Sequence, residues 1–275
     1  MSGAGTRRET AVVTGAGRGI GREIARRLAE RGYAVLVTDV DEQSAKQTAA
    51  ELGAPAWSLP LDVRDPDAQR AVAAAAAETG PLRVWVNNAG VLRTKKIWEH
   101  DNDEIRLIVE VNLLGVTWGS RAAVEAMGTD GGQIINISSL SAFGPLPGLG
   151  VYAATKAAVL SFTGSLQGEL EEVGRPIRVH AVCPDSVATE MVDERAADPD
   201  SAIIFSAPKL RSAAEVADQA VALLDSEKIV LVVPRWRGWV ARSLAPFPRV
   251  GLKTLAAFRR QGERKRKKAL TKGLT

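Results

Sequence analysis

Tyr152, Lys156 and Ser139 are the side chains of this sequence best suited to proton transfer. Tyr152 and Lys156 lie four residues apart in a segment that predicts a helix, so both project from one helix face. A free phenol has a pKa of about 10, and a nearby ammonium favours its ionised form, which would bring Tyr152 into a useful range. Ser139 follows an apolar run, where its hydroxyl could hold a substrate carbonyl near Tyr152. Without Ser139, the Tyr–Lys pair would more simply be an exposed helix face.

A glycine-rich turn at residues 14–21 (Thr-Gly-Ala-Gly-Arg-Gly-Ile-Gly) joins a predicted strand to a predicted helix. Glycines let the backbone approach a pyrophosphate, and free N–H groups at the helix start attract its charge. Asp39 ends the next predicted strand, where a carboxylate can accept hydrogen bonds from both ribose hydroxyls and repel a 2′-phosphate. We therefore predict NAD rather than NADP, although Arg18 could pair with such a phosphate. A plain tight turn, and a helix cap at Asp39, are the alternatives.

Short apolar runs alternate with longer amphipathic segments along the body of the chain. This alternation predicts an α/β protein with a doubly wound parallel sheet, the Rossmann fold, whose ligands bind at the carboxyl ends of the strands. The predicted strands are 11–13, 33–38, 82–86, 133–137, 177–183 and 229–233, and the predicted helices are 20–31, 42–52, 103–127, 152–173 and 213–225.

Several motifs occur in one order: the glycine turn, the segment 87–90 (Asn-Asn-Ala-Gly), Asn112, Ser139 and the Tyr152–Lys156 pair. In this order and spacing the sequence resembles the short-chain dehydrogenase/reductase family of NAD(P)-dependent oxidoreductases over about residues 8–234. The resemblance implies that Tyr152 exchanges a proton with the substrate while Ser139 orients the carbonyl. It further implies that Lys156 binds the nicotinamide ribose and lowers the pKa of Tyr152, and that Asn112 holds a water of the proton relay.

The resemblance also implies cofactor contacts outside the glycine turn. Segment 88–90 would line the cofactor after the fourth strand, although a strand-end turn is the alternative for the two asparagines. Asp62 and Val63 resemble the family's adenine-contacting pair, and Val187 and Thr189 its nicotinamide-contacting loop. The residues predicted to contact NAD are Gly15, Gly17, Arg18, Gly19, Ile20, Gly21, Asp39, Asp62, Val63, Asn88, Ala89, Gly90, Tyr152, Lys156, Pro184, Val187 and Thr189.

The sequence departs from the family pattern in two places. The family commonly has Pro-Gly after its sixth strand, whereas this chain reads Pro184-Asp185. We expect Asp185 to cap the next turn, and a change in the polarity of the substrate is the alternative. The family's common enzymes end soon after the last strand, in a segment that helps to build a tetramer, but this chain continues beyond Pro234. This extension puts the usual tetramer in doubt. We expect a homo-oligomer that is at least a dimer, formed through the helices beginning near Asp103 and Tyr152.

The C-terminal segment 235–275 differs in charge from the preceding 234 residues. It contains 13 Lys and Arg residues and one acidic residue, Glu263, whereas 1–234 contains 23 basic and 31 acidic residues. We divide the chain into a Rossmann-fold dehydrogenase domain, 1–234, and a basic amphipathic extension, 235–275. Trp236, Trp239 and Phe247 recur at helical spacing among basic residues, a pattern that suits an anionic membrane surface. Packing on a partner subunit and a solvated tail are the alternatives.

The predicted substrate is a small hydrophobic alcohol or ketone. The candidate pocket residues are mostly apolar and offer no obvious clamp for a carboxylate or phosphate, and segment 203–205 is expected to form a mobile lid over them. The other candidate pocket residues are Ser141, Phe143, Pro145, Leu146, Leu149, Met191 and Val192.

A non-catalytic protein is the alternative, either a dinucleotide sensor or a nucleic-acid-binding protein that uses the basic tail. The complete Ser139, Tyr152 and Lys156 set argues against it, so no nucleic-acid partner is expected. One cysteine, Cys183, and two histidines leave too few ligands for a zinc site, and we expect no metal. We find no secretory signal and no membrane span, which predicts a cytoplasmic protein, with peripheral membrane contact through 235–275.

Overall fold

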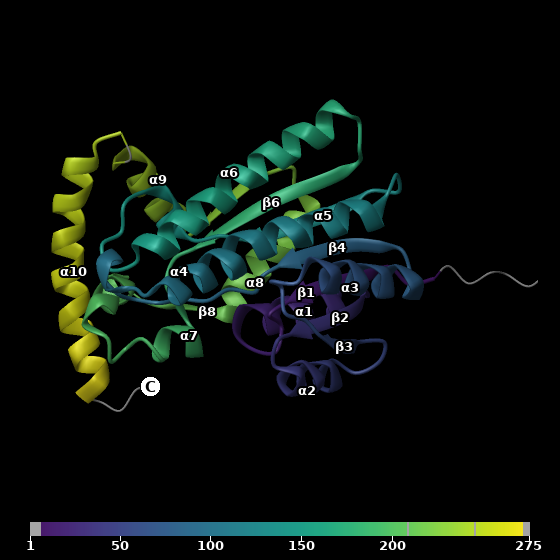
Figure 1. Cartoon of the computed structure of the whole chain (residues 1–275), viewed down its shortest axis with the longest axis horizontal. Coiled ribbons are helices and arrows are strands. Elements are labelled where there is room, and N and C mark those ends of the chain that lie inside the picture. Colours follow the sequence, from purple (N-terminus) through teal and green to yellow (C-terminus); the bar gives the residue numbers. More distant parts are fainter. Residues whose placement is uncertain (1–6, 208, 245, 272–275) are drawn as a thin grey trace, which may run out of the picture.

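Parallel strands form the centre of the molecule (Figure 1). The computed structural model describes residues 7–207, 209–244 and 246–271, so the ends of the two predicted domains, 1–6 and 272–275, lie outside the described residues. The strand order is β3-β2-β1-β4-β5-β6-β9, with every neighbouring pair parallel, which confirms the predicted fold class. The strands are β1 (Thr10–Thr14), β2 (Ala34–Asp39), β3 (Trp57–Pro60), β4 (Leu82–Asn87), β5 (Gly132–Ile137), β6 (Ile177–Pro184) and β9 (Val230–Val233).

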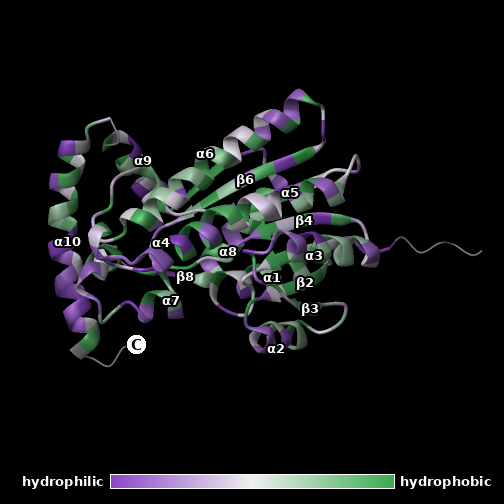
Figure 2. Ribbon diagram, in the orientation of Figure 1, coloured by the Kyte–Doolittle hydropathy of each residue, from purple (hydrophilic) through white to green (hydrophobic). Residues whose placement is uncertain are grey.

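Helices cover both faces of this sheet. Alternate strand residues point to opposite faces, so Val13 packs in one hydrophobic cluster and Val12 in the other. Because both faces are covered, the strands are mostly apolar, and much of their length is green in Figure 2, with purple stretches on β4 and β6. The first cluster includes α1 (Gly19–Glu30), α2 (Glu42–Leu52) and α8 (Ala213–Val221), and the second includes α3 (Pro66–Thr79), α5 (Gly115–Met127) and α6 (Gly150–Glu172).

Local sequence explains where three of these six helices begin. Asp41 caps α2 and Asp65 caps α3, each by accepting hydrogen bonds from backbone N–H groups of the first turn. Ser212 and Glu215 form a capping box at the start of α8. At α1, by contrast, the side chain of the N-cap residue Arg18 makes no capping hydrogen bond. The N–H groups at the start of α1 are therefore available to an anionic ligand.

Two parts of the chain differ from the sequence prediction. The helix expected at 103–127 consists of α4 (Asn102–Val109), a π-helical turn η2 (Glu110–Leu114) and α5. It is long and apolar enough to cross a bilayer, but its residues Val111, Ala122 and Met127 pack in the core of the fold. Between residues 53 and 81, where no element was predicted, lie the short edge strand β3 and helix α3.

The described chain ends in two helices, α9 (Arg235–Leu244) and α10 (Pro248–Thr271), which we call the C-terminal hairpin. Figure 1 shows α10, in yellow, along one end of the molecule beside α9. Helix α9 packs on β9 and on the short turn η3 (Leu140–Phe143), and α10 packs along η4 (Pro199–Ser206). The remaining elements are η1 (Ile97–Glu99), β7 (Val187–Ala188), α7 (Glu190–Asp193), β8 (Arg211–Ser212) and η5 (Ala222–Asp225).

Candidate active site

A cavity of about 800 Å³ lies at the carboxyl ends of the central strands. Its lining begins at Gly15 and Asp39, after β1 and at the end of β2, and continues past Asn88, after β4. It reaches Ser139, after β5, and Tyr152 in α6. This is where ligands bind in open parallel sheets, because the strand order reverses beside β1 and leaves a crevice there.

The glycine turn is held in a conformation that other residues would disturb. Gly15 has a φ of +61°, in the left-handed region that favours glycine. A Cβ on Gly21 would lie 2.3 Å from the Gly15 carbonyl oxygen and 2.4 Å from Nδ2 of Asn88. That Nδ2 donates to the carbonyl oxygens of Thr14 and Gly15, at 2.9 and 2.8 Å. Asn88 therefore fixes the turn beside the uncapped start of α1, an arrangement that fits a pyrophosphate.

Asp39 and Arg18 frame the end of the cavity where the ribose of adenosine would lie. One carboxylate oxygen of Asp39 accepts a hydrogen bond from the backbone N–H of Gly17 at 3.0 Å, and the other accepts from that of Asp41 at 3.1 Å. Arg18 pairs with Glu190 of α7 at 2.6 Å, and this hydrogen bond raises the pKa of the guanidinium. The basic side chain that could have bound a 2′-phosphate is thus already paired with a carboxylate.

Asp62 and Val63 line the cavity at the same end, as predicted for an adenine contact, and Arg64 lines it beside them. Arg64 donates to both carboxylate oxygens of Asp62, with a shortest distance of 2.6 Å, and these hydrogen bonds lower the pKa of Asp62. Arg64 was not among the residues predicted from the sequence. Its position next to Asp62, after β3, is the signal that could have identified it.

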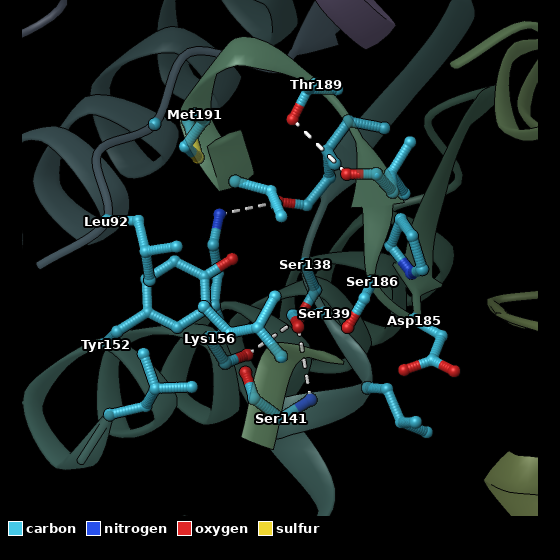
Figure 3. A pocket seen from close by; sticks show the side chains of 18 of the residues that line it. Leu92, Ser138, Ser139, Ser141, Tyr152, Lys156, Asp185, Ser186, Thr189 and Met191 are labelled. Atoms are coloured by element: carbon cyan, nitrogen blue, oxygen red, sulfur yellow. Dashed lines mark hydrogen bonds between the residues drawn. The ribbon is translucent and has the colours of Figure 1, made fainter. Parts of the chain in front are cut away.

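Tyr152, Lys156 and Ser139 meet at the other end of the cavity, as Figure 3 shows. The Nζ atom of Lys156 lies 5.7 Å from the centre of the Tyr152 ring and donates to the Ile137 carbonyl at 2.8 Å. The hydroxyl of Ser138 donates to the Lys156 carbonyl oxygen at 2.8 Å, which ties α6 to the end of β5. The Ser139 oxygen accepts from the N–H of Ser141 at 3.1 Å and so begins η3. Two neighbouring elements, α6 and β5, therefore fix all three side chains.

Burial dominates the ionisation of this triad. It raises the pKa of Tyr152 to about 12, against a smaller opposite effect of the hydrogen bond with Ser139. It also lowers the pKa of Lys156 to about 8, because the buried ammonium is poorly hydrated. The expectation that Lys156 lowers the pKa of Tyr152 stays a prediction, since burial is the larger effect in the protein without cofactor. The ammonium is directed at the Ile137 carbonyl.

Asn112 lies in the π-helical turn and is fully buried. Its amide Nδ2 donates to the Val91 carbonyl, and its Oδ1 accepts from the Val91 N–H, both at 2.8 Å. The side chain therefore holds the irregular segment that follows Gly90 against the π-helical turn. π-Helical turns are common at functional sites because the extra residue re-aims side chains and carbonyls. The water-holding role that the resemblance implies for Asn112 is a prediction that these contacts leave untested.

Most of the predicted site residues line this one cavity. Of the predicted catalytic and cofactor residues, Gly17, Gly21 and Asn112 stand behind its wall, where they hold Asp39, Gly15 and Val91 in place. The predicted residues that line the cavity are Gly15, Arg18, Gly19, Ile20, Asp39, Asp62, Val63, Asn88, Ala89, Gly90, Ser139, Tyr152, Lys156, Pro184, Val187 and Thr189. In the described part of the chain, no group of three or more His, Cys, Asp and Glu side chains is arranged to hold a metal ion.

The substrate end of the cavity is apolar and has an additional wall. The expected lid segment contributes Ile203 and Ile204, whereas Phe205 is buried in the cluster behind them and lies beneath α10. The additional wall is the C-terminal hairpin, which the sequence analysis placed outside the site. Its lining residues are Trp236, Arg237, Val240, Ala241, Leu244, Gly251, Thr254, Leu255 and Phe258, and the other predicted pocket residues on the lining are Ser141, Phe143, Pro145, Leu146, Leu149, Met191 and Val192.

Asp185, one of the two departures from the family pattern, pairs with this hairpin. Its Oδ2 lies 2.6 Å from Nη1 of Arg237, and both side chains are nearly buried. The expectation that Asp185 caps the next turn missed this partner, which is 52 residues away in the sequence.

Comparisons with known proteins decide the family. The family model for short chain dehydrogenases matches residues 9–200. The chain belongs to the short-chain dehydrogenase family. It is 36% identical over 226 residues to the 3-oxoacyl-[acyl-carrier-protein] reductase FabG of Escherichia coli (strain K12), a match that covers 81% of this chain and 91% of that protein. It is 39% identical over 187 residues to a galactitol 2-dehydrogenase (L-tagatose-forming) of Cereibacter sphaeroides, covering 66% of this chain and 72% of that one.

The probable oxidoreductase EphD of Mycobacterium tuberculosis is 38% identical over 187 residues, 66% of this chain, but the match spans only 31% of that longer protein. Among solved structures, a short chain dehydrogenase/reductase from Burkholderia phymatum in complex with NAD is similar, with a TM-score of 0.78 and 26% identity. It matches over 86% of this chain and 92% of that one. Membership of this family does not favour the non-catalytic alternative.

Proposed function

We propose that the protein transfers a hydride between NAD(H) and a small hydrophobic secondary alcohol or ketone, with Tyr152 as the general acid and base. The observation that supports this most directly is the meeting of Tyr152, Lys156 and Ser139 beside a glycine-lined channel in one cavity. Apolar side chains, including Leu92 and Met191, surround the reacting group and exclude water. In the alternative function, a pure dinucleotide sensor, the triad would have no use.

Each side chain of the triad then has its own role in the reaction. During reduction the Tyr152 hydroxyl gives its proton to the carbonyl oxygen of the substrate, and during oxidation it takes the proton back. The Ser139 hydroxyl holds that oxygen beside the phenol. Lys156 remains mostly protonated at neutral pH, because its pKa is about 8. The nicotinamide cofactor would supply or accept the hydride and, in its oxidised form, add a positive charge that favours the phenolate.

A turnover screen tests the proposal. NADH fluorescence is followed while the full chain is offered a panel of ketones, and NAD reduction is followed with the corresponding alcohols. Turnover with apolar members of the panel is the expected result. Salt-dependent binding of DNA without any dehydrogenase activity would instead favour the non-catalytic alternative.

The preference for NAD over NADP rests on Asp39 and Arg18. The Asp39 carboxylate lies where a 2′-phosphate would have to approach, and Arg18 is paired with Glu190. We expect NADH to bind at least about tenfold more tightly than NADPH, which corresponds to about 1.4 kcal/mol. Side-by-side fluorescence titrations measure this ratio, and tighter binding of NADPH would contradict it.

The assembly and the cellular location belong to the same proposal. We expect at least a homodimer through the long helices α4–α5 and α6, as the resemblance implies, and light scattering measures the mass. Cys183 is a buried free thiol, as suits a reducing cytoplasm. The division into a dehydrogenase domain, 1–234, and an extension, 235–275, stays part of the proposal, with α9 beginning at Arg235.

The outer surface of the hairpin supports contact with an anionic membrane. Trp239 is 74% exposed and Phe247 is 62% exposed, and basic residues such as Arg242 and Arg249 are exposed near them in the chain. Each basic residue at such a surface contributes about 1 kcal/mol. The exposed aromatic side chains would insert into the same surface, so co-sedimentation with anionic vesicles should weaken in the double variant Trp239→Ser, Phe247→Ser. Trp98→Ser is the matched control, since Trp98 is 81% exposed on η1, outside the hairpin, and equal binding of all three proteins would contradict the contact.

A further inference from the structure

The C-terminal hairpin is attached beside the reaction centre by one buried guanidinium. The Arg237 and Asp185 side chains are only 14% and 10% exposed, and the ion pair joins α9 to the end of β6. The guanidinium carbon of Arg237 also lies 5.8 Å from the centre of the Phe258 ring in α10, and Nη2 lies 3.5 Å from the Ser206 hydroxyl of η4. The two departures from the family pattern, Asp185 and the extended C-terminus, are therefore two halves of one contact.

Helix α10 is also fitted to the body in its second half. A Cβ on Gly262 would lie 1.9 Å from the Ala202 carbonyl oxygen, so only glycine allows this close approach to η4. Arg266 is 6% exposed and donates to the carbonyl oxygens of Ala196 and Ala197 at 3.1 and 3.3 Å. The helix therefore occupies a defined position, unlike the solvated tail that was one alternative for this segment.

The hairpin presents apolar side chains to the cavity and charged ones to solvent. Leu255 and Phe258 pack against the same cluster of buried residues as Tyr152, so an apolar surface extends from the phenol to α10. Arg264 and Lys268 of α10 are exposed, and Figure 2 shows the second half of this helix largely purple. A helix that served only to cover the body would bury its apolar face against that body. Here part of that face lines an open cavity instead.

We propose that the inner face of the hairpin is a binding subsite for an extended hydrocarbon portion of the substrate, remote from the reacting carbon. The family match ends at residue 200, so this subsite lies outside the part of the chain shared with the family model. The role of this subsite in a reaction rests on the proposed oxidoreductase function, but its ability to bind a hydrocarbon chain does not. The geometry assigns Leu255 and Phe258, rather than residues near Ser139, to the recognition of length.

A series of 2-alkanones from four to twelve carbons tests the subsite through binding as well as turnover. Calorimetric affinity for the NAD-loaded full chain, which cannot reduce a ketone, should rise about fourfold for each methylene that enters the subsite. Leu255→Ser should weaken binding of 2-dodecanone at least about tenfold and leave that of 2-butanone nearly unchanged. Leu252→Ser is the matched control, because Leu252 is exposed on the same helix, and it should behave as the unsubstituted protein.

Two outcomes overturn the proposal. The first is an affinity of the unsubstituted protein that does not increase with chain length, and the second is an equal loss for short and long ketones in Leu255→Ser. Circular dichroism and NADH affinity of each variant separate loss of the subsite from loss of the fold. If long ketones bind with the expected length dependence but are not turned over, the subsite is supported. The proposed function is then contradicted instead.

Discussion

The two ends of the cavity are built from different kinds of contact. At the cofactor end, hydrogen bonds to the backbone set the geometry, such as those from Asn88 to the glycine turn and from the Gly17 N–H to Asp39. At the substrate end, apolar side chains from distant segments meet, and two ion pairs, Asp185–Arg237 and Asp200–Arg259, attach the hairpin. The first kind of contact tolerates few residue types, whereas the second can be altered one side chain at a time.

This difference explains how one fold can keep its cofactor and change its substrate. A dinucleotide has a constant shape, so a turn whose backbone approaches it closely must keep its glycines. An apolar wall recognises size more than identity, because burial energy depends on the area removed from water. The two ends should therefore respond to different substitutions, and four variants examine whether they do.

Tyr152→Phe should have the largest effect, because it removes the hydroxyl that we propose as the general acid and base, at the point where the two ends meet. Proton transfer by a positioned side chain contributes about 10²–10⁴-fold, so kcat should fall by about 10³-fold or more. NADH affinity should change little, since the glycine turn and Asp39 are untouched. Steady-state kinetics with a verified substrate and a fluorescence titration give the two values. A variant that keeps most of its kcat would show that another group transfers the proton.

Arg237→Met tests the substrate end alone. It leaves the nearly buried Asp185 carboxylate without its partner, which should lower the free energy of unfolding by about 3 kcal/mol. Adding Asp185→Asn removes the unpaired charge, so the double variant should recover most of that loss. Urea unfolding measures both, and NADH affinity should stay near that of the unsubstituted protein. A double variant no more stable than the single one would mean that the ion pair does not secure the hairpin.

What could be predicted from the sequence also differs between the two ends of the cavity. Asp39 and Asn88 could be placed from the sequence because each follows a predicted strand, and parallel strands bring their carboxyl ends together. Helix α3 was missed although Asp65 followed by Pro66 is a recognisable helix start. The polar contacts of Asn112 could not be predicted, since they depend on a π-helical turn that the periodicity of the segment does not reveal.

The position of the C-terminal hairpin could not be predicted from the sequence, for a physical reason. Periodicity shows that Trp236 and Leu244 lie on an apolar helix face, but an apolar face fits a membrane, a partner subunit or the chain's own cavity equally well. What selects the cavity is the match of Arg237 to Asp185 and of Gly262 to Ala202, and such long-range pairings leave no local pattern. Trp239 is exposed on the outer face of the hairpin, so the predicted membrane contact remains a separate proposal.

Gly21→Ala tests the cofactor end alone. Its Cβ would meet the Gly15 carbonyl oxygen and Nδ2 of Asn88 at less than 2.5 Å, so the turn must shift. Overpacking of this kind costs about 1–3 kcal/mol, which predicts a loss of NADH affinity of about tenfold to a hundredfold. Gly168→Ala is the control, because a Cβ there meets open space. Unchanged 2-dodecanone binding by Gly21→Ala would show that the two ends are independent, whereas a parallel loss would mean that they are one unit.

Substitution of Lys156 should have the smallest effect. It tests whether the ammonium group of Lys156 is buried at the reaction centre. Burial lowers the pKa of its ammonium from near 10.5 to about 8 in the folded chain. Between these values the unfolded chain binds a proton that the folded chain has released, so the stability contributed by Lys156 rises with pH. Below pH 8 both states are protonated, and that contribution is lost. Tyr152 opposes this trend only above pH 10, because its pKa rises from 10 to about 12.

Urea unfolding of the unsubstituted protein and of Lys156→Met between pH 7 and pH 10 measures this contribution. One pKa unit corresponds to about 1.4 kcal/mol, so the stability difference between the two proteins should move by about 2 kcal/mol in favour of the unsubstituted protein from pH 8 to pH 10. Arg18→Met is the control from the cofactor end. Arg18 is exposed, and its raised pKa keeps it charged throughout this range, so the Arg18→Met difference should stay flat. A flat Lys156→Met difference would place the ammonium in contact with water. The reaction centre would then be held together as the cofactor end is, by hydrated and paired polar groups.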